Sequence, residues 1–269
     1  MTETLKGNVL RGHYWDSHAN EMRIKRRGLN SFCCQLDLLS LRRHELGRDA
    51  IERQFFGRVD TLGAIARDIL VTKGVNALDG GLRLDFARLV LSLEARRPMF
   101  VSKLRNLKGE ITTMLDNDPE VIALANQSGI TERPSEFYQR QTGVLLEDRA
   151  LLMIQGMVDN PMVGGRLINA AWRIFRLGRS DETLILSDRP LIRFCAYDDQ
   201  NAVWILPLNP RAMFVAANSA QNIGILDFYS ANRLAKYVNK LSAKQTERFA
   251  FSITDSHGEW LEKYLGPRR

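Results

Sequence analysis

The stretch "NAVWILPLNPRAMFVAAN", residues 201–218, decides the fold class, because it holds two apolar runs on either side of a proline-rich break. Each run has the length and the aromatic or β-branched content of a strand. Two earlier runs, "WRIFRLG" and "TLILSD", precede it at short spacing, and the loop "GRSDE" between them is typical of a hairpin. We therefore predict an antiparallel β meander over about residues 172–218, with "TLILSD" as a central strand.

The break between the last two runs contains Pro207, Asn209 and Pro210. Proline donates no hydrogen bond to a sheet and so excludes a continued central ladder. The break therefore predicts a rigid corner near a strand end, next to Asp188.

Outward from the meander, the period of the apolar residues changes to that of helices. Residues 46–170 carry helical stripes, one of which runs from Ile51 to Ile69. We expect further helices at about 86–97, ending before Pro98, at 99–115, and as one long helix starting at Ser135. Residues 226–265 are also expected to be helical, with Phe228, Leu234, Val238 and Leu241 on one face.

The first 41 residues are predicted to be β-rich. "VLRGHYW" and "EMRIKRR" flank the turn "DSHAN" as a hairpin, whereas "NSFCCQLDLLSL" fits either a strand or a short helical turn. A lone hairpin is marginal in water, so the two β portions should share one sheet or two abutting sheets. The fold class is therefore α+β, mainly helical, and we predict a single domain over residues 1–269.

The chain is basic, with a net charge of +7 and a pI near 9.5. This charge permits an anionic partner such as nucleic acid or a phosphorylated small molecule. The one dense basic run is "RIKRRGLN", so Arg23, Lys25, Arg26 and Arg27 are candidate nucleic-acid-binding residues. The alternative is a solvated strand edge, where charge discourages edge-to-edge pairing.

Several classes of function find no support in the sequence. The three cysteines form no C-x-x-C pair and the four histidines no H-x-x-x-H pair, so we expect no metal site and no cofactor. Walker, G-x-S-x-G and H-E-x-x-H motifs are absent. Without a signal peptide or a membrane-spanning run, and with an odd cysteine count, we expect unbridged thiols and a cytoplasmic location.

Polar residues at the ends of apolar elements are the remaining candidates. Ser187 and Asp188 end "TLILSD" before Pro190; they form either an Asx-type turn or a catalytic pair at a sheet edge. Arg96 and Arg97 end a helix as candidate anion-binding residues, and Asp188 is the expected partner of Arg96. Asn239 is either a third binding residue or an ordinary solvated helix residue.

These motifs resemble a known family. "SLEARRP", "LSDRPL", "WILPLNPRAMF" and "VNKLSAKQTERFAFS" are similar to the bacterial family of unknown function numbered 4238. The resemblance covers most of the chain and carries the family pattern onto Arg96, Pro98, Ser187, Asp188, Pro190, Pro207, Pro210 and Asn239. It implies an α+β protein with no assigned activity.

One feature of that family has no counterpart here. Members usually begin with a His-Tyr-Val-Pro motif, whereas "GHYW" holds His13 and Tyr14 without a following proline. If the histidine of that motif acts with the Ser-Asp pair in relatives, the resemblance implies a chain that is inactive, shortened or begun at a late start codon.

Two functions follow as hypotheses. The first is an anion-binding cleft lined by Arg96, Asp188 and Asn239 that binds or acts on nucleic acid or a nucleotide. The second is a non-enzymatic interaction module in which Arg96 and Asp188 form a structural ion pair.

Overall fold

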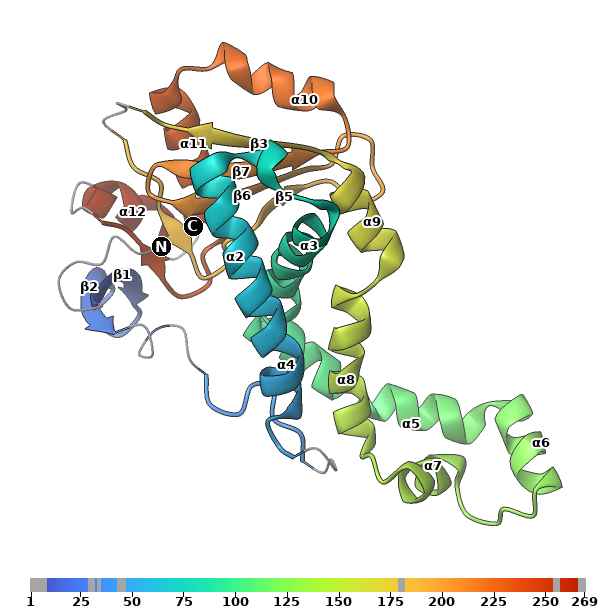
Figure 1. Cartoon of the computed structure of the whole chain (residues 1–269). Helices are drawn as coiled ribbons and strands as arrows, with labels where there is room; N and C mark the ends of the chain where they lie inside the picture. The colour runs from blue at the N-terminus through green and yellow to red at the C-terminus, as the bar shows by residue number, and fades with distance from the viewer. Residues whose placement is uncertain are drawn as a thin grey trace. The chain divides into compact units, whose positions relative to one another are not determined.

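The computed structural model describes residues 9–28, 32, 35–42, 47–178, 182–253 and 257–265 (Figure 1). The chain divides into two compact units. The first contains Met1–Cys34, Gly63–Leu93 and Pro161–Arg269, and the second contains Gln35–Leu62 and Glu94–Asn160. That the whole chain behaves as a single domain stays a prediction.

An antiparallel four-stranded sheet forms the centre of the first unit. Its strands are β3 (Ala171–Arg176), β5 (Ile192–Phe194), β6 (Val203–Asn209) and β7 (Ala212–Ala217), in the order β3-β7-β6-β5. Strands β6 and β7 are the two runs that the proline-rich break separates. The α+β prediction is therefore confirmed.

Helices cover both faces of this sheet. On one face Trp172, Trp204 and Phe214 pack against α2 (Gly57–Lys73), α3 (Gly80–Ala95) and α9 (Pro161–Asn169). On the other face Ile205 and Met213 pack against α10 (Ala220–Gly224) and α11 (Ala231–Gln245). Because both faces are covered, every residue of β7 is buried, which explains its unbroken apolar sequence.

Pro207 lies inside β6 rather than beyond its end, which corrects the predicted corner. Strand β5 pairs with β6 only from Val203 to Ile205, so Pro207 occupies a position beyond that pairing. The register with β7 shifts between Pro207 and Asn209. The proline is tolerated because no β5 residue pairs with it and the ladder is irregular there.

A second antiparallel sheet joins the N-terminal hairpin to the rest of the first unit. It contains β1 (Val9–Asp16), β2 (Glu21–Gly28), β4 (Leu186–Ser187) and β8 (Ala250–Phe251), in the order β2-β1-β8-β4. The hairpin was predicted to share one sheet with the meander or to abut it as a second sheet; β4 is the meander strand that joins the hairpin's sheet, while β3, β5, β6 and β7 form the other sheet. Helices α11 and α12 (Gly258–Leu265) supply Ala243 and Leu261 to the core beside it.

Strand β4 corrects two predictions. It is two residues long and lies at the end of the second sheet, so "TLILSD" is not a central strand. Its pairing partner is β8, whereas β3 pairs with β7, so no hairpin joins β3 to β4. Strand β8, in a region predicted to be helical, makes this arrangement possible.

Helices α2 and α3 approach closely at a glycine. A side chain added at Gly63 would place its Cβ 2.5 Å from the Cβ of Leu89, so only glycine fits there.

Two short 3₁₀ helices are also described in the first unit, η2 (Val75–Ala77) and η3 (Ile225–Phe228). Phe228 belongs to η3 and is 87% exposed, so it does not share the buried face of Leu234 and Val238.

The second unit is helical in its described residues. It contains η1 (Ile51–Phe56), α4 (Pro98–Asn106), α5 (Lys108–Asn117), α6 (Pro119–Gln127), α7 (Pro134–Thr142) and α8 (Leu146–Val158). The helix predicted at 99–115 is divided into α4 and α5. The long helix predicted from Ser135 is α7 and α8, because Gly143 takes a left-handed conformation (φ 66°) that ends α7.

The prediction for the cysteines is tested at one position. Cys195 is a free, exposed thiol, whereas Cys33 and Cys34 fall outside the described residues. Most of "NSFCCQLDLLSL" up to Cys34 falls outside them as well. No helix in the described part of the chain has the length and apolar character needed to cross a membrane.

Candidate functional site

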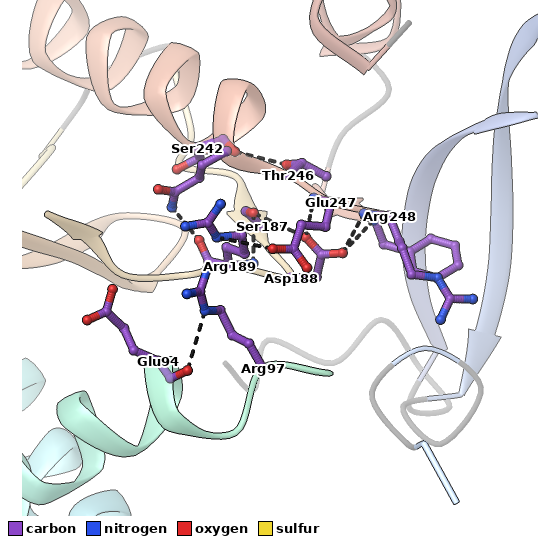
Figure 2. A network of polar contacts seen from close by, with 11 residues as sticks. Glu94, Arg97, Ser187, Asp188, Arg189, Ser242, Thr246, Glu247 and Arg248 are labelled. Carbon is purple, nitrogen blue, oxygen red and sulfur yellow. Dashed lines mark hydrogen bonds and ion pairs between the residues drawn. The ribbon is translucent and has the colours of Figure 1, made fainter. Parts of the chain in front are cut away.

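The Ser187–Asp188 pair is bonded to the backbone. Ser187 Oγ accepts a hydrogen bond from the amide of Arg189 at 2.9 Å, which closes a local turn. The Asp188 carboxylate accepts from the amides of Glu247, Arg248 and Phe249 at 2.9, 2.6 and 3.0 Å (Figure 2). The pair therefore joins the end of β4 to the segment that leads into β8. The predicted Asx-type turn is replaced by a serine turn and a long-range carboxylate bond.

Neighbouring side chains strengthen the same junction. Arg189 Nε lies 3.5 Å from a carboxylate oxygen of Glu247, and the side-chain amide of Gln245 donates to the carbonyl of Arg189. Thr246 Oγ1 donates to the carbonyl of Ser242 at 2.9 Å (Figure 2). These structural contacts are sufficient to explain why "LSDRPL" contains polar residues. A catalytic role for Ser187 and Asp188 stays a prediction.

Asn239 is buried, with 2% of its surface exposed, so the expectation of a solvated helix residue is wrong. Its Oδ1 accepts from the amide of Ile185 at 2.9 Å, and its Nδ2 donates to the carbonyl of Thr183 at 2.8 Å. One side chain of α11 thus pairs with the backbone just before β4 as a neighbouring strand would. A ligand-binding role for Asn239 stays a prediction.

Arg96 has a carboxylate partner within the second unit. Its guanidinium donates two hydrogen bonds of 2.7 Å to Asp60 and lies 4.7 Å from the centroid of the Phe56 ring. The carboxylate that pairs with Arg96 in the second unit is therefore Asp60, because α2 and the end of α3 bring these two side chains together. A pairing of Arg96 with Asp188 stays a prediction.

Arg97 begins α4 as its N-cap residue. Its Nε donates to the carbonyl of Glu94 at 3.3 Å, near the end of α3 (Figure 2). This hydrogen bond stabilises the turn between α3 and α4. Anion binding by Arg97 stays a prediction.

A double-mutant cycle tests the Arg96–Asp60 pair. The two side chains are 20% and 45% exposed, so solvent screens the pair, and we expect a coupling of about 1 kcal/mol in urea unfolding. A parallel cycle of Arg96→Ala with Asp188→Ala should be additive. A larger coupling in the Asp188 cycle than in the Asp60 cycle would instead support the pairing of Arg96 with Asp188.

The basic run lies on β2, the edge strand of the second sheet, and its side chains are exposed. Arg23 forms ion pairs with Asp16 at 3.0 Å and Glu21 at 2.8 Å, which neutralise it. Lys25 and Arg27 have no ion-pair partner among the residues that the structure describes. Arg26 lies on the opposite side of the strand because side chains alternate.

Aromatic rings share the side of the sheet that carries Lys25 and Arg27. Opposite residues of an antiparallel pair project to one side, and the pairs here are Tyr14 with Arg23, Gly12 with Lys25, and Leu10 with Arg27. The ring centroids of Tyr14 and Phe249 are 5.7 Å apart. The guanidinium carbon of Arg248, an exposed residue, lies 5.4 Å from the centroid of the Phe249 ring. We name this surface the basic face and define it as Tyr14, Arg23, Lys25, Arg27, Arg248 and Phe249.

Gly12 and Phe32 pack together on the side of the sheet that carries the basic face. A Cβ at Gly12 would lie 2.6 Å from the Phe32 ring, so the ring packs directly on the strand backbone. The Phe32 ring also packs edge to face against Phe249 and Phe251, with ring centroids 5.1 and 5.4 Å apart. The aromatic side chains are thereby held in one cluster. Sequence reasoning missed Arg248 and Phe249 because β8 has no strand pattern of its own.

A histidine and a serine form a buried pair behind this surface. His13 Nε2 lies 2.8 Å from Ser252 Oγ, and these residues are 0% and 7% exposed. Their burial indicates a structural bond in the core. Within the described ranges, no three or more His, Cys, Asp or Glu side chains gather as metal ligands.

Comparison with known proteins identifies the family. The family described as "Protein of unknown function (DUF4238)" matches residues 11–256. The chain belongs to this family. The predicted resemblance is thereby confirmed, and the DUF4238 match runs from β1 through β8 and includes residues of both units. No curated protein and no solved structure matches the chain.

Proposed function

We propose that the protein binds single-stranded nucleic acid through the basic face. The observation that carries this proposal is the combination of unpaired cations and half-buried aromatic rings on one side of the second sheet. Lys25, Arg27 and Arg248 are exposed, and no described residue forms an ion pair with them. Positive charge that no protein carboxylate neutralises attracts phosphates.

The aromatic residues favour a single strand over a duplex. Proteins that bind single strands combine a basic groove with rings on which bases stack. Tyr14 and Phe249 are partly exposed next to the cations, and their mutual contact fixes both rings. Bases in a duplex are already stacked on each other and would leave these rings unused.

Binding is favoured over catalysis by the state of the candidate catalytic residues. Asp188 accepts three backbone hydrogen bonds, and Ser187 Oγ accepts another. A carboxylate engaged in this way is poorly available as a general base. The proposal is therefore a binding module, and Lys25, Arg27 and Arg248 are its contacts.

Two matched triple variants test the proposal. In the first, Lys25, Arg27 and Arg248 become glutamine. In the control, the exposed cations Lys103, Arg133 and Arg149 of the second unit become glutamine, which lowers the net charge by the same amount. Binding to a labelled oligothymidine of about 12 nucleotides, within the ~4–16 that such sites cover, is measured by fluorescence anisotropy.

The salt dependence identifies the contacts. Three phosphate contacts predict a slope of log K against log salt of about −2 for the unaltered protein between about 50 and 200 mM salt. We expect the basic-face variant to bind weakly with a slope near zero, and the control variant to keep the affinity and slope of the parent. An equal loss of affinity in both variants would show that the oligonucleotide responds to the net charge of the protein and not to the basic face. Tighter binding of a polyglutamate peptide than of the oligonucleotide would overturn the proposal in favour of an acidic protein partner.

A further inference from the structure

A cleft of about 630 Å³ opens in the first unit, away from the residues of the basic face. One wall is the side of α9 that carries Pro161, Met162, Gly165, Arg166 and Asn169, together with Ala170. The opposite wall comes from Asp198 and Gln200 in the loop between β5 and β6, and from Asn218 and Ser219 after β7. This volume falls within the range of about 300–1,000 Å³ found for small-molecule sites.

The loop wall is held in place by hydrogen bonds. Asn218 Nδ2 donates to the carbonyls of Tyr197 at 3.1 Å and Asp199 at 2.6 Å, on either side of Asp198. The backbone amide of Asn218 donates to the carbonyl of Ala202 at 3.1 Å. Asp198 is thereby presented by a loop whose neighbouring positions are tied to the sheet.

The helix wall is equally anchored. Leu167, next to Arg166, is fully buried in the core between the helices and the first sheet. The indole of Trp172 donates to the carbonyl of Leu167 at 2.7 Å. Both walls are therefore anchored to the core. A site with fixed walls needs little rearrangement when a ligand binds.

Four polar side chains of the cleft are not used by the fold. Arg166, Asn169, Asp198 and Gln200 are exposed, and within the described part of the chain none of their side chains bonds to another residue. Elsewhere in the first unit, Arg173 and Arg189 have carboxylate partners. Uncommitted groups on fixed walls can bind a ligand without losing a contact of the protein.

The charges and shapes of the lining limit the ligand. The cleft holds one cation, Arg166, and one anion, Asp198, so a neutral molecule with both charges complements it better than a simple anion. No aromatic ring lines the cleft, so a nucleobase would find nothing to stack on. Pro161, Met162 and Ala170 offer apolar contact to an aliphatic portion.

We propose that this cleft binds a small zwitterion, namely a free amino acid or a dipeptide. The carboxylate of the ligand pairs with the guanidinium of Arg166, whose fork suits that group. The ammonium group pairs with Asp198, and amides of Asn169 and Gln200 bond to polar groups between them. None of these residues belongs to the basic face, so the test of this site is independent of the test of nucleic-acid binding.

Titrations followed by NMR chemical shifts test the site in the full chain. The probes are L-leucine, L-glutamine and glycylglycine, with the deaminated acid and the decarboxylated amine of each. We expect at least one zwitterion to saturate, and both of its singly charged analogues to bind about tenfold more weakly or worse, since each loses one ion pair. Inorganic phosphate and AMP serve as anionic contrasts and should bind more weakly than the zwitterion.

Single substitutions assign the two contacts. Arg166→Gln and Asp198→Asn should each weaken the binding of the zwitterion about tenfold, while Arg149→Gln, an exposed arginine of the second unit, should leave it unchanged. Thermal melting checks that all three variants are folded. No saturation by any of the three zwitterions, tighter binding of phosphate or AMP, or unchanged binding in both cleft variants would overturn the proposal.

Discussion

Asn239→Ala should lower the free energy of unfolding by about 3–5 kcal/mol, the largest effect expected for a single substitution here. The substitution leaves the amide of Ile185 and the carbonyl of Thr183 without their partners, at residues that are 0% and 5% exposed. Each buried group left unsatisfied costs about 1–3 kcal/mol, and the cavity adds to that loss. Urea unfolding followed by circular dichroism measures the difference.

Two further variants give this result its meaning. Asn126→Ala, at an exposed asparagine of α6, should change stability by less than about 0.5 kcal/mol. Asn239→Asp keeps the acceptor for Ile185, but only its protonated form can donate to Thr183. Burial raises the pKa of this introduced carboxyl in the folded state, so the variant should be most stable at low pH and lose stability as the pH rises. A stable Asn239→Ala protein that has lost ligand binding would instead favour the binding role.

Asp188→Ala is expected to cost about 2–4 kcal/mol of unfolding free energy. Three backbone amides lose a charged acceptor, and hydrogen bonds to charged groups contribute about 1.5–3 kcal/mol each when buried. The estimate stays below the sum because two of the three amides lie at exposed positions that water can reach. Asp188→Asn keeps one acceptor oxygen and should fall between the parent and the alanine variant.

A matched aspartate provides the control for this position. Asp198 is exposed and has no described partner for its side chain, so Asp198→Ala should leave the unfolding curve unchanged. The same two variants also separate structure from catalysis at Asp188. Parent-like stability of Asp188→Ala would remove the structural account and return this carboxylate to the list of candidate catalytic groups.

Local patterns in the sequence predicted the elements whose form depends on neighbours along the chain. The stripe from Ile51 to Ile69 marks η1 and α2, because helix packing repeats every 3.6 residues. The cap of α6 is equally local, because the Asp118 carboxylate accepts from the amides of Glu120 and Val121, two and three residues further along the chain. Strands β6 and β7 follow from their apolar runs in the same way.

Short strands were beyond local patterns. Strands β4 and β8 have two residues each, which is too short for an alternation to be seen. They exist because each pairs with the other and β8 also pairs with β1, about 240 positions away in the chain. The sheet that a two-residue strand joins is set by these distant partners.

The partners of polar side chains were likewise decided by the tertiary structure. With 38 basic and 31 acidic residues, the sequence alone offers Arg96 many carboxylates, and the packing of α2 against α3 selects Asp60. Asp188 and Asn239 are candidate residues from their positions at or beside apolar elements, but their bonds run to backbone groups that have no sequence signature. Arg166 and Asp198 came together as a cleft without any motif. Periodicity is a local property of the chain, whereas a polar contact depends on which distant segments the folded core holds within about 3 Å of each other.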